Sequence, residues 1–374
     1  MKKLAVTVLT IMIGGLMLLV AGCTPEANPA GKTSSPPEAG PAVRLVFTAQ
    51  PGGAVAGATL GTQPAVAVVD AGGDIVTDYR GFVVLAITEG TGSSRENLFG
   101  GTQIGVVNGR VEFKDISIAR AGDDYTLTVT SGSLEPATSE PFAIEAGEPY
   151  QLSFTTHPSD GVAGSPLATQ PEVTVLDYYG NKVTSYQGSV TLAAFLNNEE
   201  TSVRTEILGT VTAPVVKGVA SFTDIYFELA IPGYNLRAAG GSLEIASSKS
   251  FTIEPAEPTG LIVSVHPEGA AAGTPFETQP KVAVLDSYGN VVSDTGISIT
   301  ISITPGTGTA GAVLSGTTTL VADDGLGGLA VFRDLAIDKA GSGYTLTATT
   351  SDMASATSSG LTSATSQAFD VTAP

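Results

Sequence analysis

The stretch Thr169–Thr184 reads TQPEVTVLDYYGNKVT, and related copies of it lie on either side in the chain. The prolines of the three copies are Pro64, Pro171 and Pro280, so the stretch recurs at two nearly equal intervals. An interval of about 100 residues is too long for a solenoid repeat and matches a small domain with its own core. The sequence therefore predicts three similar domains in tandem.

Within the stretch, apolar and polar residues alternate, with Thr174 between Val173 and Val175. A period of two over β-branched residues is typical of a half-buried strand. The residues from Asp177 to Asn181 predict a turn, because Asp hydrogen-bonds its own backbone and Gly supplies a positive φ angle. A calcium loop is the alternative, but the several oxygen ligands and the distal Glu of such a loop are not spaced that way.

The N-terminus has the pattern of an export signal. Lys2 and Lys3 precede an apolar run from Leu4 to Val20, and the run ends in the letters VAGC at Cys23. This end resembles the lipobox of bacterial lipoproteins. The resemblance implies removal of a signal peptide over residues 1–22 and lipidation of Cys23, which would hold the protein to a membrane. An uncleaved transmembrane helix is the alternative, although 17 residues with internal Gly are marginal for spanning.

After the cysteine the composition changes. Residues 24–42 are dense in Pro, Gly, Ser and Ala without apolar periodicity, which predicts a disordered tether. The predicted organisation is a signal peptide over 1–22, the lipidated cysteine and tether over 23–42, and repeats over 43–147, 148–256 and 257–374.

The charge of the chain limits its partners. The formal net charge is −19 at pH 7, which disfavours nucleic acid and anionic lipid surfaces. The only cysteine lies at the predicted anchor, so the domains depend on hydrophobic burial and not on disulfides.

Each repeat has further fixed points after the opening stretch. An F-x-D-I/L step begins at a phenylalanine, and a tyrosine follows it at the same spacing in all three repeats. These pairs are Phe113 with Tyr125, Phe222 with Tyr234, and Phe332 with Tyr344. About seven short extended runs per repeat, with turn signals between them and no convincing helix, predict an antiparallel β-sandwich. The approach to each tyrosine resembles a tyrosine corner, so we expect structural roles for all three.

The order of these signals resembles the bacterial immunoglobulin-like repeats of invasin- and intimin-type surface proteins. The TQP-V-V-D strand with its Gly-containing turn, the F-x-D-I/L step and the Y-x-L strand carry the resemblance over Val43–Val371. It implies an all-β fold of three tandem immunoglobulin-like antiparallel β-sandwich domains. Filamin-type repeats are an alternative within the same architecture. The resemblance is weak for function, because this fold serves many unrelated roles.

The connections between repeats are short and contain proline. They read EAGEP over residues 145–149 and EPAEP over residues 254–258, which predicts a semi-rigid rod. Their paired acids raise the alternative of junction calcium, without the full ligand set that such a site needs. The run Ser351–Ser366 in the third repeat is a low-complexity loop that could carry O-glycans.

Candidates for catalysis are few. The two histidines, His157 and His266, occupy the same repeat position, where the first repeat has Gln50, and this repetition favours a structural role. A catalytic triad, a zinc ligand set and a phosphate-cradling glycine motif are all missing from the sequence. We therefore predict a protein without enzymatic activity, cofactor or metal.

The leading hypothesis is an exported, lipid-anchored stalk on the cell membrane or outer membrane that faces the exterior and mediates adhesion. Its partner would be an extracellular protein or glycan bound by loops or sheet edges. The least similar loops supply the candidate binding residues Arg95, Glu96, Asn97, Phe99, Asn197, Asn198 and Arg204. The alternative is a structural spacer of the cell envelope. Clustered, exposed aromatics on one repeat would favour binding, and the sequence offers Phe99 and Phe195 as candidates.

Overall fold

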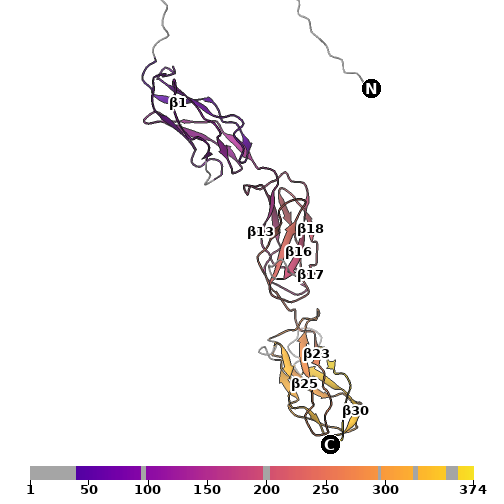
Figure 1. The fold of residues 1–374 in the computed structure, drawn as a ribbon. Coiled ribbons are helices and arrows are strands. Elements are labelled where there is room, and N and C mark those ends of the chain that lie inside the picture. Colours follow the sequence, from indigo (N-terminus) through magenta and orange to yellow (C-terminus); the bar gives the residue numbers. More distant parts are fainter. Residues whose placement is uncertain (1–38, 94–97, 197–202, 294–295, 323–326, 351–360) are drawn as a thin grey trace, which may run out of the picture.

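In this computed structural model, the described residues are 39–93, 98–196, 203–293, 296–322, 327–350 and 361–374. Every element assigned to them is a β-strand, β1 to β33, and none of these residues forms a helix long and apolar enough to cross a membrane. Each sheet takes its strands from β1–β12, from β13–β22 or from β23–β33, which we call modules 1, 2 and 3. Figure 1 shows the modules following one another end to end.

Module 1 has two main sheets, with strand orders β1-β3-β7 and β11-β10-β4-β6, a second three-stranded sheet β2-β12-β9 and the pair β5-β8. Its strands are β1 (Arg44–Ala49), β2 (Ala54–Val55), β3 (Ala65–Val69), β4 (Phe82–Ile87), β5 (Leu98–Phe99), β6 (Gln103–Gly105), β7 (Arg110–Glu112), β8 (Ser117–Ile118), β9 (Gly122–Tyr125), β10 (Leu127–Thr130), β11 (Ala137–Thr138) and β12 (Phe142–Glu145).

Module 2 repeats the arrangement with the orders β13-β15-β19 and β17-β16-β20-β21, where β18 also pairs with β16, and with the pair β14-β22. Its strands are β13 (Gln151–Thr156), β14 (Gly161–Val162), β15 (Glu172–Leu176), β16 (Ser189–Leu196), β17 (Val203–Thr205), β18 (Thr212–Pro214), β19 (Val219–Ser221), β20 (Tyr234–Ala239), β21 (Ala246–Ser247) and β22 (Ile253–Glu254).

Module 3 has the orders β23-β24-β28 and β27-β25-β31-β32 with the pairs β26-β29 and β30-β33. Its strands are β23 (Gly260–Val265), β24 (Lys281–Leu285), β25 (Ser298–Ile303), β26 (Leu314–Ser315), β27 (Thr319–Val321), β28 (Leu329–Val331), β29 (Ala336–Ile337), β30 (Gly341–Tyr344), β31 (Leu346–Thr350), β32 (Ala364–Thr365) and β33 (Phe369–Val371). The strands outnumber the predicted seven or so per repeat, because several of them are only two residues long.

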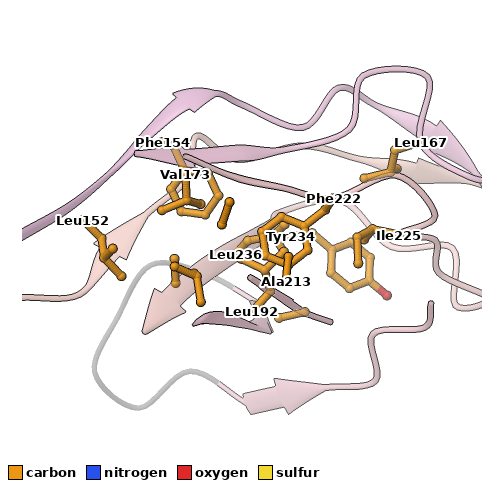
Figure 2. Packing of buried hydrophobic residues seen from close by; sticks show 14 of the residues in the cluster. Leu152, Phe154, Leu167, Val173, Leu192, Ala213, Phe222, Ile225, Tyr234 and Leu236 are labelled. Carbon is orange, nitrogen blue, oxygen red and sulfur yellow. The ribbon is translucent and has the colours of Figure 1, made fainter. Parts of the chain in front are cut away.

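Each module buries its own hydrophobic core, to which both of its main sheets contribute side chains. In Figure 2, side chains from both sheets of module 2, among them Val173 and Leu192, point into one interior. The described part of the chain is therefore all-β, with three tandem immunoglobulin-like β-sandwiches, as predicted. The opening strand was predicted to be half-buried, but Thr174 is also buried, and its hydroxyl lies 3.1 Å from that of Thr155. The side chain of Thr155, from the neighbouring strand β13, packs beside Thr174 on the face opposite the core.

The repeated motifs contact one another within each module. The side chain of Gln170, in the TQP motif, donates to the carbonyls of Leu167 and Ile225 and accepts from the N–H of Ile225. Gln63 and Gln279 make the corresponding bonds in the other modules. The TQP glutamine therefore fixes the F-x-D-I/L step, which lies far along the chain in the later half of the module.

The tyrosine corners are present. The hydroxyls of Tyr125, Tyr234 and Tyr344 donate to carbonyls five residues upstream at 3.0, 2.8 and 2.9 Å, and the three side chains are fully buried. The structural role predicted for these tyrosines is confirmed. They secure the sandwich and are not part of a surface site.

The two histidines are also structural. The Nδ1 atoms of His157 and His266 accept the backbone N–H groups of Lys249 and Gln367, both at 3.1 Å. Gln50 accepts the N–H of Glu140 with its side-chain oxygen in the same way. In each module, this hydrogen bond connects the end of the first strand to the segment before the last strand.

Candidate functional site

The predicted turn that follows β15 binds the segment that connects module 1 to module 2. One oxygen of Asp177 accepts the N–H groups of Tyr179 and Asn181, and the other accepts the Asn181 side-chain amide and the N–H of Gly147 in the connection. Burial opposes ionisation of Asp177, but these hydrogen bonds outweigh it and lower its pKa below the ordinary value. Asp286 repeats the arrangement, with Ala256 in place of Gly147.

Both oxygens of Asp177 and Asp286 already accept hydrogen bonds from protein donors. This arrangement does not favour the calcium-loop alternative, because a calcium ion needs such oxygens as ligands. Among the described residues, no group of three or more His, Cys, Asp or Glu side chains is placed to hold a metal ion. We refer to the segments Asp177–Asn181 and Asp286–Asn290 as the Asp–Asn turns.

The asparagine of each Asp–Asn turn reaches into the preceding module. The Asn181 side chain donates to the carbonyl of Ala119 at 2.8 Å and accepts from the N–H of Ala121 at 2.9 Å. Asn290 makes the same pair of bonds to Glu228 and Ala230, at 2.7 and 2.9 Å. The N–H donor and the oxygen acceptor of each asparagine side chain are both paired with the preceding module, so the two modules of each junction meet in one defined orientation.

A tyrosine of each turn packs against a glycine of the preceding module. Tyr179 lies on Gly57, and Tyr288 lies on Gly164, so that a Cβ at either glycine would overlap the tyrosine ring. The two glycines have φ angles of 77° and 75°. Only glycine adopts this backbone without strain while leaving room for the ring.

The outer ends of the described rod differ from its junctions. The first module has Gly72 and Asp74 where the other turns have tyrosine and asparagine. Asp70 still accepts the N–H groups of Gly40 and Asp74, at 2.7 and 2.9 Å. At the far end of module 3, Gly273 has a φ of 81° and no heavy atom within 4 Å of its would-be Cβ. Among the described residues, the contact between a turn tyrosine and this glycine therefore occurs only where two modules meet.

A cleft of about 650 Å³ opens at the first junction. Its lining includes Arg120 and Asp123 from module 1 and Asn181 and Lys182 from module 2. The two signs of charge are mixed along the cleft, so it offers no single-sign field for a strongly charged ligand.

A cluster of three exposed tyrosines lies on module 2 beside this junction. The Tyr178 ring makes edge contacts with Tyr150 and with Tyr179, each with centroids 5.3 Å apart and with interplanar angles of 72° and 89°. Tyr178 is 70% exposed, and Tyr150 and Tyr179 are 41% and 46% exposed. The Tyr150 hydroxyl donates to Glu244 at 3.3 Å, and this carboxylate raises the pKa of the hydroxyl. We call Tyr150, Tyr178 and Tyr179 the tyrosine cluster.

The tyrosine cluster was not predicted from the sequence. Phe99 and Phe195 were the predicted exposed aromatics, and Phe99 is 49% exposed in β5. Phe195 is only partly exposed and lies under the Arg237 guanidinium, 4.4 Å from the ring centroid. A signal was present in the opening stretch, because its central copy has two adjacent tyrosines where the other copies have AG and SY.

The candidate loop residues do not form one site in the described part of the chain. Phe99 pairs with Ser117 in module 1, whereas Arg204 lies in β17 of module 2, opposite Phe195. The remaining candidates fall outside the described residues. They are Arg95, Glu96, Asn97, Asn197 and Asn198, and the predicted lipidation site Cys23 also lies outside.

Comparisons with known proteins found structural similarity only. No protein-family model matches the chain, and no curated protein matches it. Among solved structures, the FdeC adhesin of Escherichia coli is 17% identical, covers 90% of this chain and 99% of its own, and has a TM-score of 0.34. InvD of Yersinia pseudotuberculosis is 16% identical, with coverages of 82% and 92% and a TM-score of 0.34.

Invasin, a bacterial integrin-binding protein, is 14% identical over 83% of this chain and 58% of its own, again with a TM-score of 0.34. Sandwich arrays of this kind serve many unrelated roles, so similarity at this level does not identify a function. The function has to be inferred from the residues of this chain.

Proposed function

We propose that this protein is an exported, lipid-anchored stalk that holds a binding surface away from the membrane and mediates adhesion. The observation that carries the proposal is the repeated junction, in which Asn181 and Asn290 each make the same two hydrogen bonds to the preceding module. Modules that need only flexible tethering require no such contacts. A fixed joint at every connection suits a rod that keeps a surface at a set distance.

Each joint combines three restraints. The aspartate binds the connecting segment, the asparagine binds the preceding module, and the tyrosine packs on a glycine. The three elements come from one five-residue turn, so bending at the junction would disturb them together. The predicted semi-rigid rod agrees with this geometry.

The anchor completes the proposal. Lipidation of Cys23 and a tether over residues 23–42 would place module 1 nearest the membrane and module 3 furthest from it. Domain boundaries at residues 147 and 256 stay predictions, as do an outward-facing location and the lack of enzymatic activity. The tyrosine cluster favours a binding stalk over a spacer, because a spacer has no need of exposed aromatic surface.

Small-angle scattering on residues 24–374, which contain all three cores, tests the stalk. We expect an elongated particle, and a broader distribution of distances for the double variant Asn181→Ala/Asn290→Ala. A compact wild-type particle would overturn the proposal. Cell fractionation tests the anchor, since Cys23→Ser in the full chain should move the protein out of the membrane fraction.

The spacer alternative predicts the same scattering but no ligand. Immobilised residues 24–374 can be presented to cell-envelope extract, matrix proteins and glycans, with the three-module rod confirmed beforehand by scattering. A retained and identified partner supports the adhesive stalk. Failure to retain any partner, with the rod intact, supports the spacer.

A further inference from the structure

The tyrosine cluster provides more aromatic surface than its junction requires. Module 3 forms an equivalent joint with Tyr288 alone, because the positions of Tyr150 and Tyr178 are held there by Thr259 and Ser287. Thr259 and Tyr150 occupy equivalent positions in the fold. Tyr150 donates its backbone N–H to the carbonyl of the last residue of β15, and Thr259 donates to the last residue of β24 in the same way. The two extra tyrosines of module 2 are therefore not needed to join modules.

The exposed area of the cluster indicates the size of a ligand. A tyrosine presents on the order of 200 Å², so the three exposed fractions leave roughly 300 Å² of tyrosine surface. A stable protein–protein interface needs about 800 Å² on each partner. The cluster alone falls short of that area, which favours a small ligand.

The chemistry of the cluster selects a neutral, hydroxyl-rich ligand. Aromatic faces provide an apolar stacking surface, and the phenol groups add polar handles. Glu244, which is exposed beside Tyr150, can accept hydrogen bonds from ligand hydroxyls. The net charge of −19 and this carboxylate disfavour anionic ligands.

We propose that Tyr150, Tyr178 and Glu244 form a binding site for neutral saccharides on module 2. The apolar C–H face of a sugar ring stacks on Tyr178, the most exposed ring, which Tyr150 and Tyr179 hold by their edge contacts. Glu244 accepts hydrogen bonds from the ring hydroxyls. This inference deepens the proposed function by naming the ligand class, and it rests on that function only for the outward display of the site.

The double variant Tyr150→Thr/Tyr178→Ser tests the site, because it gives module 2 the residues that module 3 already has. Tyr179, which packs on Gly57, is kept. The probes are a panel of neutral hexose and N-acetylhexosamine oligosaccharides, and affinities are measured on residues 24–374. We expect binding by the wild type and a loss of at least about tenfold in the variant. Circular dichroism and scattering should be unchanged.

Tyrosine fluorescence gives a second readout, because the chain contains no tryptophan. A bound saccharide should change the emission of the wild type and leave that of the variant unchanged. Equal binding by both proteins would overturn the site, and lack of binding across the whole panel would overturn the ligand class. Binding of proline-rich peptides instead of saccharides would also overturn the ligand class. The rod measured by scattering is independent of all these outcomes, so the stalk and the saccharide site fail separately.

Discussion

The junctions between modules 1 and 2 and between modules 2 and 3 use the same joint with different surroundings. The hydrogen bonds to the preceding module measure 2.8 and 2.9 Å for Asn181 and 2.7 and 2.9 Å for Asn290. Tyr179 and Tyr288 both pack on glycine. Only the first junction adds exposed aromatic surface, through Tyr150 and Tyr178. Comparison of the two therefore separates residues that join modules from residues available to a ligand.

The glycine under each tyrosine gives the largest expected effect. Gly57→Ala and Gly164→Ala each combine a strained positive φ with overlap of the tyrosine ring, so the ring must move off the glycine and the junction loses this contact. Gly273→Ala is the matched control, because its φ of 81° imposes the same strain without a neighbour to displace. We expect the strain to cost about 1–2 kcal/mol in all three variants.

Thermal unfolding and scattering check this prediction together. All three variants should lose some stability, and only Gly57→Ala and Gly164→Ala should broaden the distance distribution. If Gly273→Ala broadened it equally, the tyrosine–glycine contact would not hold the modules.

Removal of the asparagine is expected to have the next largest effect. Asn181→Ala leaves the carbonyl of Ala119 and the N–H of Ala121 without their partner, at a cost of about 1–3 kcal/mol to module coupling. Asp74→Ala is the control, since Asp74 holds the same turn position in module 1 with an exposed side chain. Its substitution should change stability by less than about 0.5 kcal/mol. Chemical unfolding with a probe in each module measures the coupling.

Acid should loosen both junctions together. The folded-state pKa values of Asp177 and Asp286 are lowered, because their hydrogen bonds outweigh the effect of burial. Their contribution is therefore fully present above the unfolded pKa of about 3.9 and is lost as the pH falls through the folded value. Scattering between pH 7 and pH 2 should show parallel loosening. Asp286→Asn should weaken the second junction at pH 7 and leave only the first with this acid response.

The fold could be predicted from local patterns, whereas the joints could not. The alternation around Val173 and the turn chemistry of Asp177 depend on adjacent residues. The buried face of the strand and the turn were therefore both predicted correctly. The partners of Asn181 lie in another module, far from it in the sequence. Only the packed structure shows what that turn contacts, because turn chemistry does not specify a distant surface.

The binding surface was missed for the same reason. Tyr150 and Tyr178 are well separated in the sequence, and the pairing of β13 with β15 brings them together. The predicted loop residues Arg95 and Asn197 lie outside the described residues and stay predictions, and a further difference between the repeats lies inside their most regular stretch. A comparison of the three copies position by position would have revealed the additional tyrosines.

The smallest expected effect lies away from the junctions, at the end of the first strand of each module. Gln50 in module 1 and His157 in module 2 accept equivalent backbone N–H groups. Burial, with a smaller contribution from Lys249, lowers the pKa of His157. Its stabilising contribution is therefore complete above the unfolded pKa of about 6.5 and declines as the pH falls toward the folded value, because the imidazolium cannot accept the N–H. His157→Gln gives module 2 the acceptor of module 1, so unfolding measured from pH 8 to pH 5 should lose part of its pH dependence. An unchanged pH profile in this variant would show that folding does not shift the pKa of His157.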